Sequence, residues 1–237
     1  LMTLYDVWVY KNPALDEIPI YSWVPLDHVT MPPAVEKYLK KDNVHPIAMS
    51  PFGQRQMAER GIESIYIPHA IDIKAYSPTG SINNVDTRKF MGVKEDDFLV
   101  GIVAANKANG QIHRKAYAEN LTAFSIFKKS HQNAKLYIHA EPSKAYGGFD
   151  LGSLVKAVGI PEDSVIPNPM DFRYGFSAPH MASLYSAMDV LLAPSYGEGF
   201  GVPTIEAQAC GTRVIGSSWA ATPDLVSEDG FLVSGQP

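Results

Sequence analysis

The second half of the sequence alternates between apolar runs and amphipathic segments, and this alternation restricts the fold more than any other feature. Apolar runs predict strands at residues 98–104, 134–140, 165–167, 189–194 and 213–216. The segments between them predict helices at residues 116–129, 151–158, 181–188 and 203–210. Strands that alternate with helices are typical of a doubly wound parallel sheet, which binds ligands beyond the carboxyl ends of its strands. We therefore predict an α/β fold, with residues 98–104 among the central strands.

The first part of the chain shows a similar pattern. Strands are predicted at residues 5–10, 18–24, 44–49 and 62–67, with helices at 32–40 and 51–60. Ser50 is a suitable N-cap for the second of these helices. Residues 68–85 are rich in Pro, Gly, Ser, Asn and Asp, which is the composition of a linker. The chain is therefore expected to divide near residue 79.

A strand, a glycine-rich turn and a helix are predicted around the sequence Ser195-Tyr-Gly-Glu-Gly-Phe-Gly-Val-Pro-Thr-Ile-Glu206. Gly199 and Gly201 would let backbone N–H groups approach an anion, and the start of a helix at Pro203 adds partial positive charge. Glu198 and Glu206 would repel phosphate, so hydroxyl groups of a sugar are their better partners. This pattern indicates a nucleotide-sugar site. The simpler alternative is that Glu198 is a solvated loop residue and that Glu206 only complements the helix dipole.

This segment resembles the E-x7-E signature of retaining glycosyltransferases of the GT-B fold, specifically glycosyltransferase family four. The resemblance continues through Ala207-Gln-Ala-Cys-Gly-Thr-Arg-Val-Ile215, and Ile67-Pro-His-Ala-Ile-Asp72 with Tyr76-Ser-Pro78 is similar to the family's interdomain crossover. It implies two Rossmann-like doubly wound parallel sheets. Residues 1–79 would be the end of the acceptor-side domain with the crossover, and residues 80–237 most of the domain that binds the donor. The first part of the N-terminal domain and the C-terminal helices have no counterpart, so we expect a fragment.

The resemblance also implies roles for the site residues. Counting back from Ala123-Phe124 places Lys115 at the family's lysine, and Arg114 is the nearest candidate for its arginine, with Lys107 second. These cations would neutralise the donor diphosphate as charge accumulates on it; a solvated loop is the alternative. The expected catalytic residues are Glu198, Lys115 and Arg114, and the expected donor-binding residues are Glu206, Gly199, Phe200, Gly201, Val202, Asn168 and Lys107. Glu206, in the first helical turn, would bind ribose hydroxyls, Glu198 the transferred sugar, and the region of Asn168 the nucleobase.

No metal or cofactor is expected. The seven histidines never form an i,i+4 pair, and Asp-x-Asp is missing. His139 ends a predicted strand and either faces the cleft or pairs locally beside Glu141. A formal net charge of −5 gives no electrostatic support for nucleic-acid binding. Hydrolase and dehydrogenase functions are disfavoured because Gly-x-Ser-x-Gly is absent and no strand leads into Gly-x-Gly-x-x-Gly.

The predicted activity is metal-independent transfer of a sugar, with retention, from a UDP- or GDP-sugar to an acceptor hydroxyl. The alternatives are a nucleotide-sugar-binding module without activity and a GT-B nucleotide-sugar epimerase. The single cysteine, Cys210, suits a reducing compartment, and no apolar run reaches the ~18 residues of a membrane span. We therefore expect a cytoplasmic protein, with membrane association unsupported by this segment. The base, the sugar and the acceptor cannot be determined from the sequence.

Overall fold

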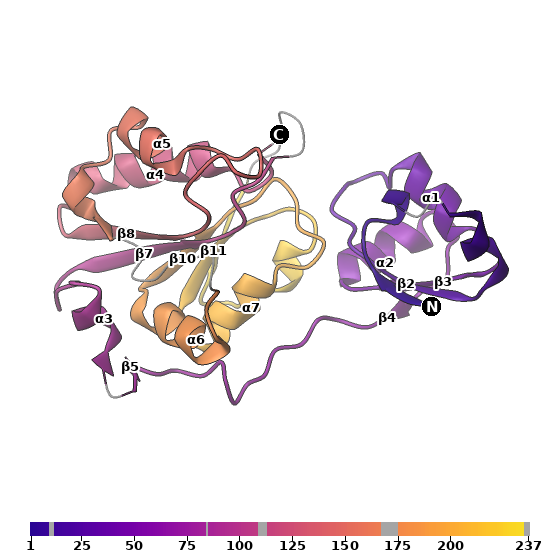
Figure 1. Ribbon diagram of the computed structural model, residues 1–237, viewed down its shortest axis with the longest axis horizontal. Helices are drawn as coiled ribbons and strands as arrows, with labels where there is room; N and C mark the ends of the chain where they lie inside the picture. Colours follow the sequence, from indigo (N-terminus) through magenta and orange to yellow (C-terminus); the bar gives the residue numbers. More distant parts are fainter. Residues whose placement is uncertain (10–11, 84, 109–112, 167–174, 235–237) are drawn as a thin grey trace.

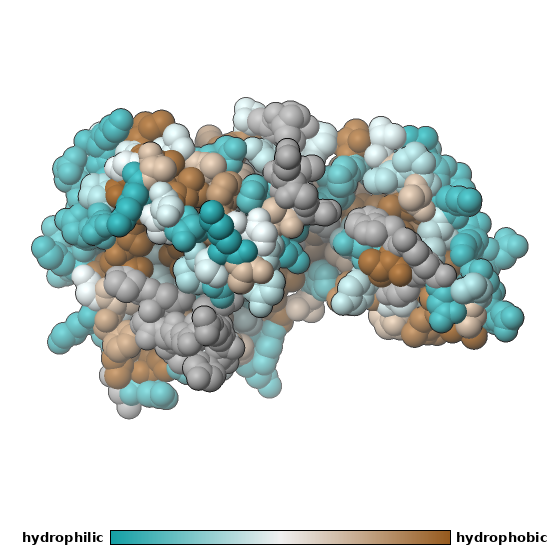
Figure 2. All heavy atoms as spheres, turned by 45° about the horizontal axis from the view of Figure 1, so that its top comes forward, coloured by the Kyte–Doolittle hydropathy of each residue, from teal (hydrophilic) through white to brown (hydrophobic). Residues whose placement is uncertain are grey.

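Two separate parallel sheets organise the chain into an N-terminal and a C-terminal lobe (Figure 1). The computed structural model describes residues 1–9, 12–83, 85–108, 113–166 and 175–234. The space-filling view shows the two lobes meeting at a narrower waist (Figure 2). The expected class, α/β with Rossmann-like parallel sheets, is confirmed.

The N-terminal lobe contains a four-stranded sheet in the order β1-β2-β3-β4, and every neighbouring pair is parallel. Two helices pack on one face, where their apolar side chains join those of β2 and β3 in one core. The oxygen of the Ser50 side chain accepts a hydrogen bond from the Gly53 N–H at 3.0 Å, which confirms the predicted N-cap. The elements are β1 Met2–Leu4, η1 Val7–Val9, η2 Pro13–Glu17, β2 Ile20–Val24, α1 Pro33–Leu39, β3 Val44–Ala48, α2 Pro51–Ala58 and β4 Ile65–Tyr66.

The other face of this sheet is apolar and exposed. Met2 lies opposite Tyr21 across the first strand pair, and the two residues are 63% and 46% exposed. Leu4 and Ile65 are also exposed. Parallel sheets are ordinarily covered on both faces. This face therefore lacks a covering layer among the described residues.

The predicted strand at residues 5–10 is wrong. The strand β1 ends at Leu4, and the 3-10 helix η1 follows. Val7 is 1% exposed and belongs to the same core as Val35 of α1. The run of β-branched and aromatic residues favours a strand locally, but the chain turns here because Val7 is buried beneath α1.

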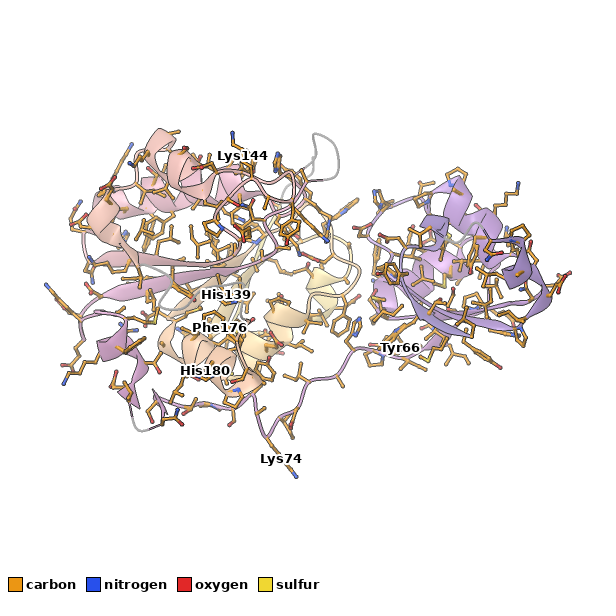
Figure 3. All side chains as sticks on the ribbon, in the orientation of Figure 1. Tyr66, Lys74, His139, Lys144, Phe176 and His180 are labelled. Carbon is orange, nitrogen blue, oxygen red and sulfur yellow. The ribbon has the colours of Figure 1, made fainter. Side chains whose placement is uncertain are left out.

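A connector runs from β4 to the C-terminal lobe, and Lys74 projects from it into solvent (Figures 1 and 3). The Thr79 N–H donates to the Ser186 hydroxyl at 3.0 Å, which attaches the connector to α6, Ala178–Ala187. The predicted linker at residues 68–85 contains part of a short antiparallel hairpin, formed by β5 Ser81–Ile82 and β6 Val85–Asp86. The helix α3, Thr87–Phe90, follows it.

The C-terminal lobe has a six-stranded parallel sheet in the order β12-β11-β10-β7-β8-β9. The helices α4 and α5 cover one face, and α6 and α7 cover the other (Figure 1). The expected central strand at residues 98–104 is confirmed as β7, which lies inside the sheet. The remaining elements are β7 Phe98–Val103, α4 Tyr117–Ser130, β8 Ala134–His139, α5 Leu151–Ala157, η3 Glu162–Ser164, β9 Val165–Ile166, β10 Val190–Ala193, α7 Val202–Ala209, β11 Arg213–Ser217, η5 Thr222–Asp224 and β12 Phe231–Val233.

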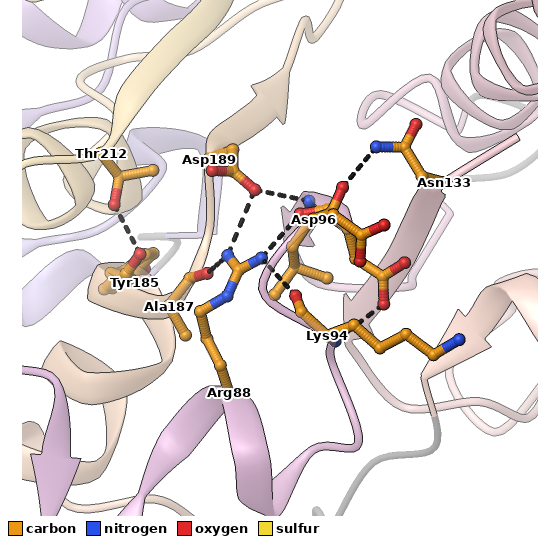
Figure 4. Close-up of polar contacts among 10 residues, drawn as sticks. Arg88, Lys94, Asp96, Asn133, Tyr185, Ala187, Asp189 and Thr212 are labelled. Atoms are coloured by element: carbon orange, nitrogen blue, oxygen red, sulfur yellow. Dashed lines mark hydrogen bonds and ion pairs between the residues drawn. The ribbon is translucent and has the colours of Figure 1, made fainter. Parts of the chain in front are cut away.

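Arg88 joins α3 to the amino-terminal edge of this sheet (Figure 4). Its guanidinium donates to the carbonyl oxygens of Ala187 and Asp97, each at 2.7 Å. It also pairs with the Asp189 carboxylate at 3.2 Å, which in turn accepts from the Leu99 N–H at 2.6 Å. One side chain therefore holds together the starts of β7 and β10.

Replacing Arg88 with alanine should lower the free energy of unfolding by about 2 kcal/mol, because partly buried carbonyls lose a charged donor. Urea denaturation measures the loss. The control is Lys89→Ala, which removes the same charge from an exposed position on the same helix. Equal midpoints for the two variants would contradict the assigned role. Ligand affinity should not change, since the functional site lies at the opposite edge of the sheet.

Candidate functional site

The loops that follow β7 and β10 meet at the carboxyl edge of the larger sheet and bring together three predicted site residues. Lys115 Nζ donates to Glu198 Oε1, and Arg114 Nη1 donates to Glu198 Oε2 at 2.9 Å. Arg114 also donates to the carbonyl oxygen of Gly197. Glu198 lies 83 residues beyond Lys115 in the sequence, so only the fold creates this cluster. The structure thus adds a direct ion-pair network that the sequence analysis did not predict.

Within this cluster, Glu198 and Lys115 are largely shielded from solvent, and Arg114 is more exposed. The side chains of Glu198 and Lys115 are 15% and 18% exposed, whereas Arg114 is 41% exposed. Burial alone would raise the pKa of Glu198, but Lys115 and Arg114 outweigh it and hold that pKa below its ordinary value. Burial lowers the pKa of Lys115 against the opposing charge of Glu198. Two cations around one carboxylate leave one positive charge in excess, which favours an incoming anion.

The glycine-rich turn between β10 and α7 is held in a conformation that needs glycine. Gly201 has φ 117° and forms the N-cap of α7, a backbone conformation that L side chains rarely adopt. The helix begins at Val202, one residue before the predicted start, with Pro203 second. No side chain caps its N-terminus. Pro203 has no N–H and the Thr204 N–H donates to the Gly201 carbonyl oxygen at 3.0 Å, which leaves the Val202 N–H for an anion.

The N-terminal lobe gives Gly199 a second reason to be glycine, which the sequence did not reveal, and gives Gly197 a reason as well. A Cβ on Gly199 would lie 2.5 Å from the Cβ of Pro25, and one on Gly197 would lie 3.0 Å from the carbonyl oxygen of Asp27. The turn after β2 therefore packs directly against the glycine-rich turn. The signal available in the sequence was the position of Asp27 just beyond a predicted strand.

The side of the N-terminal lobe that faces the cluster is acidic. Asp6 follows β1, and burial raises the pKa of its carboxyl group, with Asp27 adding to the rise and Arg114 and Lys107 opposing it. These electrostatic interactions place the Asp6 carboxyl group near the cations of the C-terminal lobe, and Asp27 lies against Gly197 of the glycine-rich turn. Residues from the two lobes therefore face each other at the carboxyl edges of their sheets.

An aromatic contact also crosses between the lobes. The ring of His69, in the connector, lies 4.4 Å from Trp23 and 5.0 Å from Phe200, measured between centroids. Phe200 is 5% exposed. Of the predicted donor-binding residues, Phe200 thus has a packing partner in the connector.

Glu206 does not lie in the first turn of α7, as predicted, but is its fifth residue. The one-residue shift in the helix start moves it into the second turn. Its carboxylate Oε2 accepts a hydrogen bond from the Tyr185 hydroxyl at 2.8 Å. A residue of α6 therefore fixes the carboxylate of Glu206 on α7.

Lys107 has an exposed side chain and lies outside the immediate contacts of Glu198, although its charge contributes to the pKa of Lys115. Its neighbour Asn106 is 3% exposed and organises the loop by donating to the carbonyl oxygens of Glu141 and Phe149. Residues 109–112 and the predicted Asn168 lie outside the described residues.

His139 ends β8 and lies against Phe176, with ring centroids 4.6 Å apart in an edge-on arrangement (Figure 3). Its Nδ1 is 3.1 Å from the Tyr137 hydroxyl. Burial lowers the pKa of His139 to about 4, so the ring is neutral at pH 7. Both sequence interpretations, a cleft residue and a locally paired residue, remain compatible with this placement.

Within the described ranges, no group of three His, Cys, Asp or Glu side chains is arranged to hold a metal ion. The helices of the same ranges include none with the length and apolar character needed to cross a membrane.

Comparison with known proteins gives a family match and several relatives that are similar over part of their length. Residues 109–237, more than half of the chain, match the family model described as glycosyl transferases group 1. A D-inositol 3-phosphate glycosyltransferase of Paenarthrobacter aurescens is 27% identical over 172 residues, which are 71% of this chain and 38% of that protein. The enzyme of the same description from an Arthrobacter strain is 42% identical over 89 residues, 37% of this chain and 20% of that protein. The chain thus spans well under half the length of these curated relatives.

Solved structures resemble both lobes. A glycosyltransferase from Rickettsia africae superposes with a TM-score of 0.68 at 15% identity, over 92% of this chain and 56% of that one. HepE from Anabaena, in complex with UDP-glucose, gives a TM-score of 0.66 at 21% identity, over 92% of this chain and 59% of that one. At these identities the likeness concerns the fold.

Proposed function

Because this chain belongs to the glycosyl transferases of group 1 and has their GT-B fold, we propose that the protein transfers a sugar from a UDP- or GDP-sugar to an acceptor hydroxyl with retention. The observation that carries the proposal is the convergence of Lys115 and Arg114 on Glu198 at the carboxyl edge of the sheet. The HepE structure contains UDP-glucose, which makes UDP the first nucleotide to test.

The charges in the site suggest how the donor would be held. Its diphosphate would pair with Lys115 and Arg114 and approach the uncapped N-terminus of α7. Glu198, released from its two partners, would then turn to the hydroxyls of the sugar. The cations of the protein would supply the charge stabilisation, so the proposed reaction uses no metal.

In the proposed reaction, the bond between the anomeric carbon and the phosphate oxygen breaks, and its electron pair leaves with the nucleoside diphosphate. The acceptor oxygen forms the new bond on the same face of the sugar, and its proton passes to the departing phosphate. Lys115 and Arg114 stabilise the charge that develops on the leaving group. The single free and buried cysteine, Cys210, supports a proposed location in the cytoplasm.

A product assay with a labelled nucleotide sugar tests this function on the whole natural protein. A new glycoside with the donor's anomeric configuration supports transfer with retention, and activity should persist in a chelator. Release of nucleotide without a glycoside would instead indicate the epimerase, and donor binding without turnover would indicate the binding module. Thermal-shift measurements with UDP, GDP and ADP identify the base, since a ligand at 100 times its Kd stabilises the folded state by about 2.7 kcal/mol.

Glu206→Gln should weaken the binding of the bare nucleotide and of the complete donor to the same extent, about tenfold to a hundredfold. A hydrogen bond to a charged acceptor contributes about 1.5–3 kcal/mol, and the proposed partner, the ribose, is common to both ligands. Calorimetry with UDP and a UDP-sugar measures the two affinities. A loss confined to the complete donor would reassign Glu206 to the transferred sugar.

A further inference from the structure

Tyr185 fixes Glu206 from the interior of the C-terminal lobe. Its side chain is fully buried on α6, and its hydroxyl donates to Glu206 Oε2 at 2.8 Å. Its own backbone oxygen accepts a hydrogen bond from the Thr212 hydroxyl, at the start of β11 (Figure 4). Tyr185, which donates to Glu206, is therefore fixed at both its backbone and its hydroxyl.

A second tyrosine reaches the same carboxylate from the connector. The Tyr76 ring centroid lies 6.4 Å from that of Tyr185. Burial raises the pKa of Tyr76, and the nearby Glu206 carboxylate raises it further. The connector is fixed nearby, because Thr79 bonds to Ser186 of α6. Glu206 thus has one tyrosine hydroxyl bonded to it from α6 and a second tyrosine beside it from the connector.

A carboxylate has about four lone-pair positions, and the Tyr185 hydroxyl occupies one on Oε2. The carboxylate therefore keeps lone-pair positions for a ligand. A glutamate side chain without such partners loses considerable rotamer freedom when it binds. A hydrogen bond that already holds the carboxylate in place before the ligand binds reduces that loss.

We propose that Tyr185 and Tyr76 are positioning residues that orient Glu206 to accept hydrogen bonds from the vicinal hydroxyls of a nucleotide ribose. This proposal rests on the proposed function and extends it to two residues outside the glycine-rich turn. It also makes the connector part of the nucleotide site, since Tyr76 belongs to the segment between the lobes.

The test compares UDP with 2′,3′-dideoxy-UDP, which lacks the hydroxyls that Glu206 would bind; GDP and its dideoxy analogue serve if UDP does not bind. We expect Tyr185→Phe to weaken UDP binding about tenfold and to change the affinity for the dideoxy analogue less than twofold. Tyr76→Phe, at a half-buried position, should show the same selectivity with a loss of about threefold. In a Glu206→Gln background, Tyr185→Phe should have no further effect on UDP binding.

The matched control is Tyr117→Phe. Tyr117 is 2% exposed, and its hydroxyl donates to the Ala104 carbonyl oxygen at 2.7 Å, on the side of the sheet covered by α4. This variant should lose stability without discriminating between the two nucleotides. Equal losses for UDP and its dideoxy analogue in both Tyr185→Phe and Tyr76→Phe would overturn the positioning role while leaving the proposed function intact. A wild-type protein that binds neither UDP nor GDP would overturn both.

Discussion

Replacing Lys115 with methionine should lower kcat for sugar transfer by about 10²–10³-fold, the cost of removing one fixed group that stabilises developing charge. Methionine keeps the length and the apolar stem of the side chain but removes the cation next to Glu198. Of the two cations that contact Glu198, only Arg114 would then face the departing nucleoside diphosphate. Turnover of a labelled nucleotide sugar by the whole natural protein measures the effect.

A buried lysine on α4, the helix that follows Lys115, provides the control. Lys128 is 8% exposed, and its Nζ donates to the carbonyl oxygen of Ala134 at 3.0 Å, at the far end of α4. Lys128→Met should reduce stability but preserve kcat per folded molecule. If both variants lose turnover equally, the loss belongs to the helix and not to a charge at the site. An unchanged kcat in Lys115→Met would remove this residue from the catalytic set.

Glu198→Gln should slow transfer by about 10²-fold or more while the affinity for the bare nucleotide does not fall. Glutamine retains the shape but loses the charge that would stabilise positive charge on the sugar as its bond to phosphate breaks. The bare nucleotide has no such sugar. In this variant the phosphates of the bare nucleotide also no longer compete with a carboxylate for Lys115 and Arg114, so the nucleotide should bind equally well or more tightly. Turnover and calorimetry give the two quantities.

Glu119→Gln is the matched variant, because Glu119 is an exposed carboxylate at the start of α4 whose partner is the Tyr196 hydroxyl at 2.6 Å. It should leave both quantities unchanged. Glu198→Gln and Glu206→Gln are expected to differ in kind: the first affects turnover, and the second affects nucleotide affinity. Equal loss of bare-nucleotide affinity in the two would refute this division of roles.

The sequence by itself determined the sheet of the C-terminal lobe. Residues of β7 and β10 form continuous apolar runs because a central parallel strand is covered by helices on both faces. The start of α2 was also predictable from local sequence, because the Ser50 side-chain oxygen accepts a hydrogen bond from an N–H only three residues further along the chain. Local pattern failed where a distant element decided the conformation, as when the burial of Val7 under α1 replaced a predicted strand with a 3-10 turn.

Only the tertiary structure decided how the site is assembled. The motif placed Glu198 and Lys115 among the candidates, but their ion pair joins loops 83 residues apart, and no local pattern encodes such a contact. The closeness of Pro25 to Gly199 depends on how two lobes pack. The hydrogen bond from Tyr185 to Glu206 depends on the packing of α6 beside α7. Short-range preferences and apolar periodicity are properties of neighbouring residues in the chain, whereas these contacts exist because separate segments bury surface against one another.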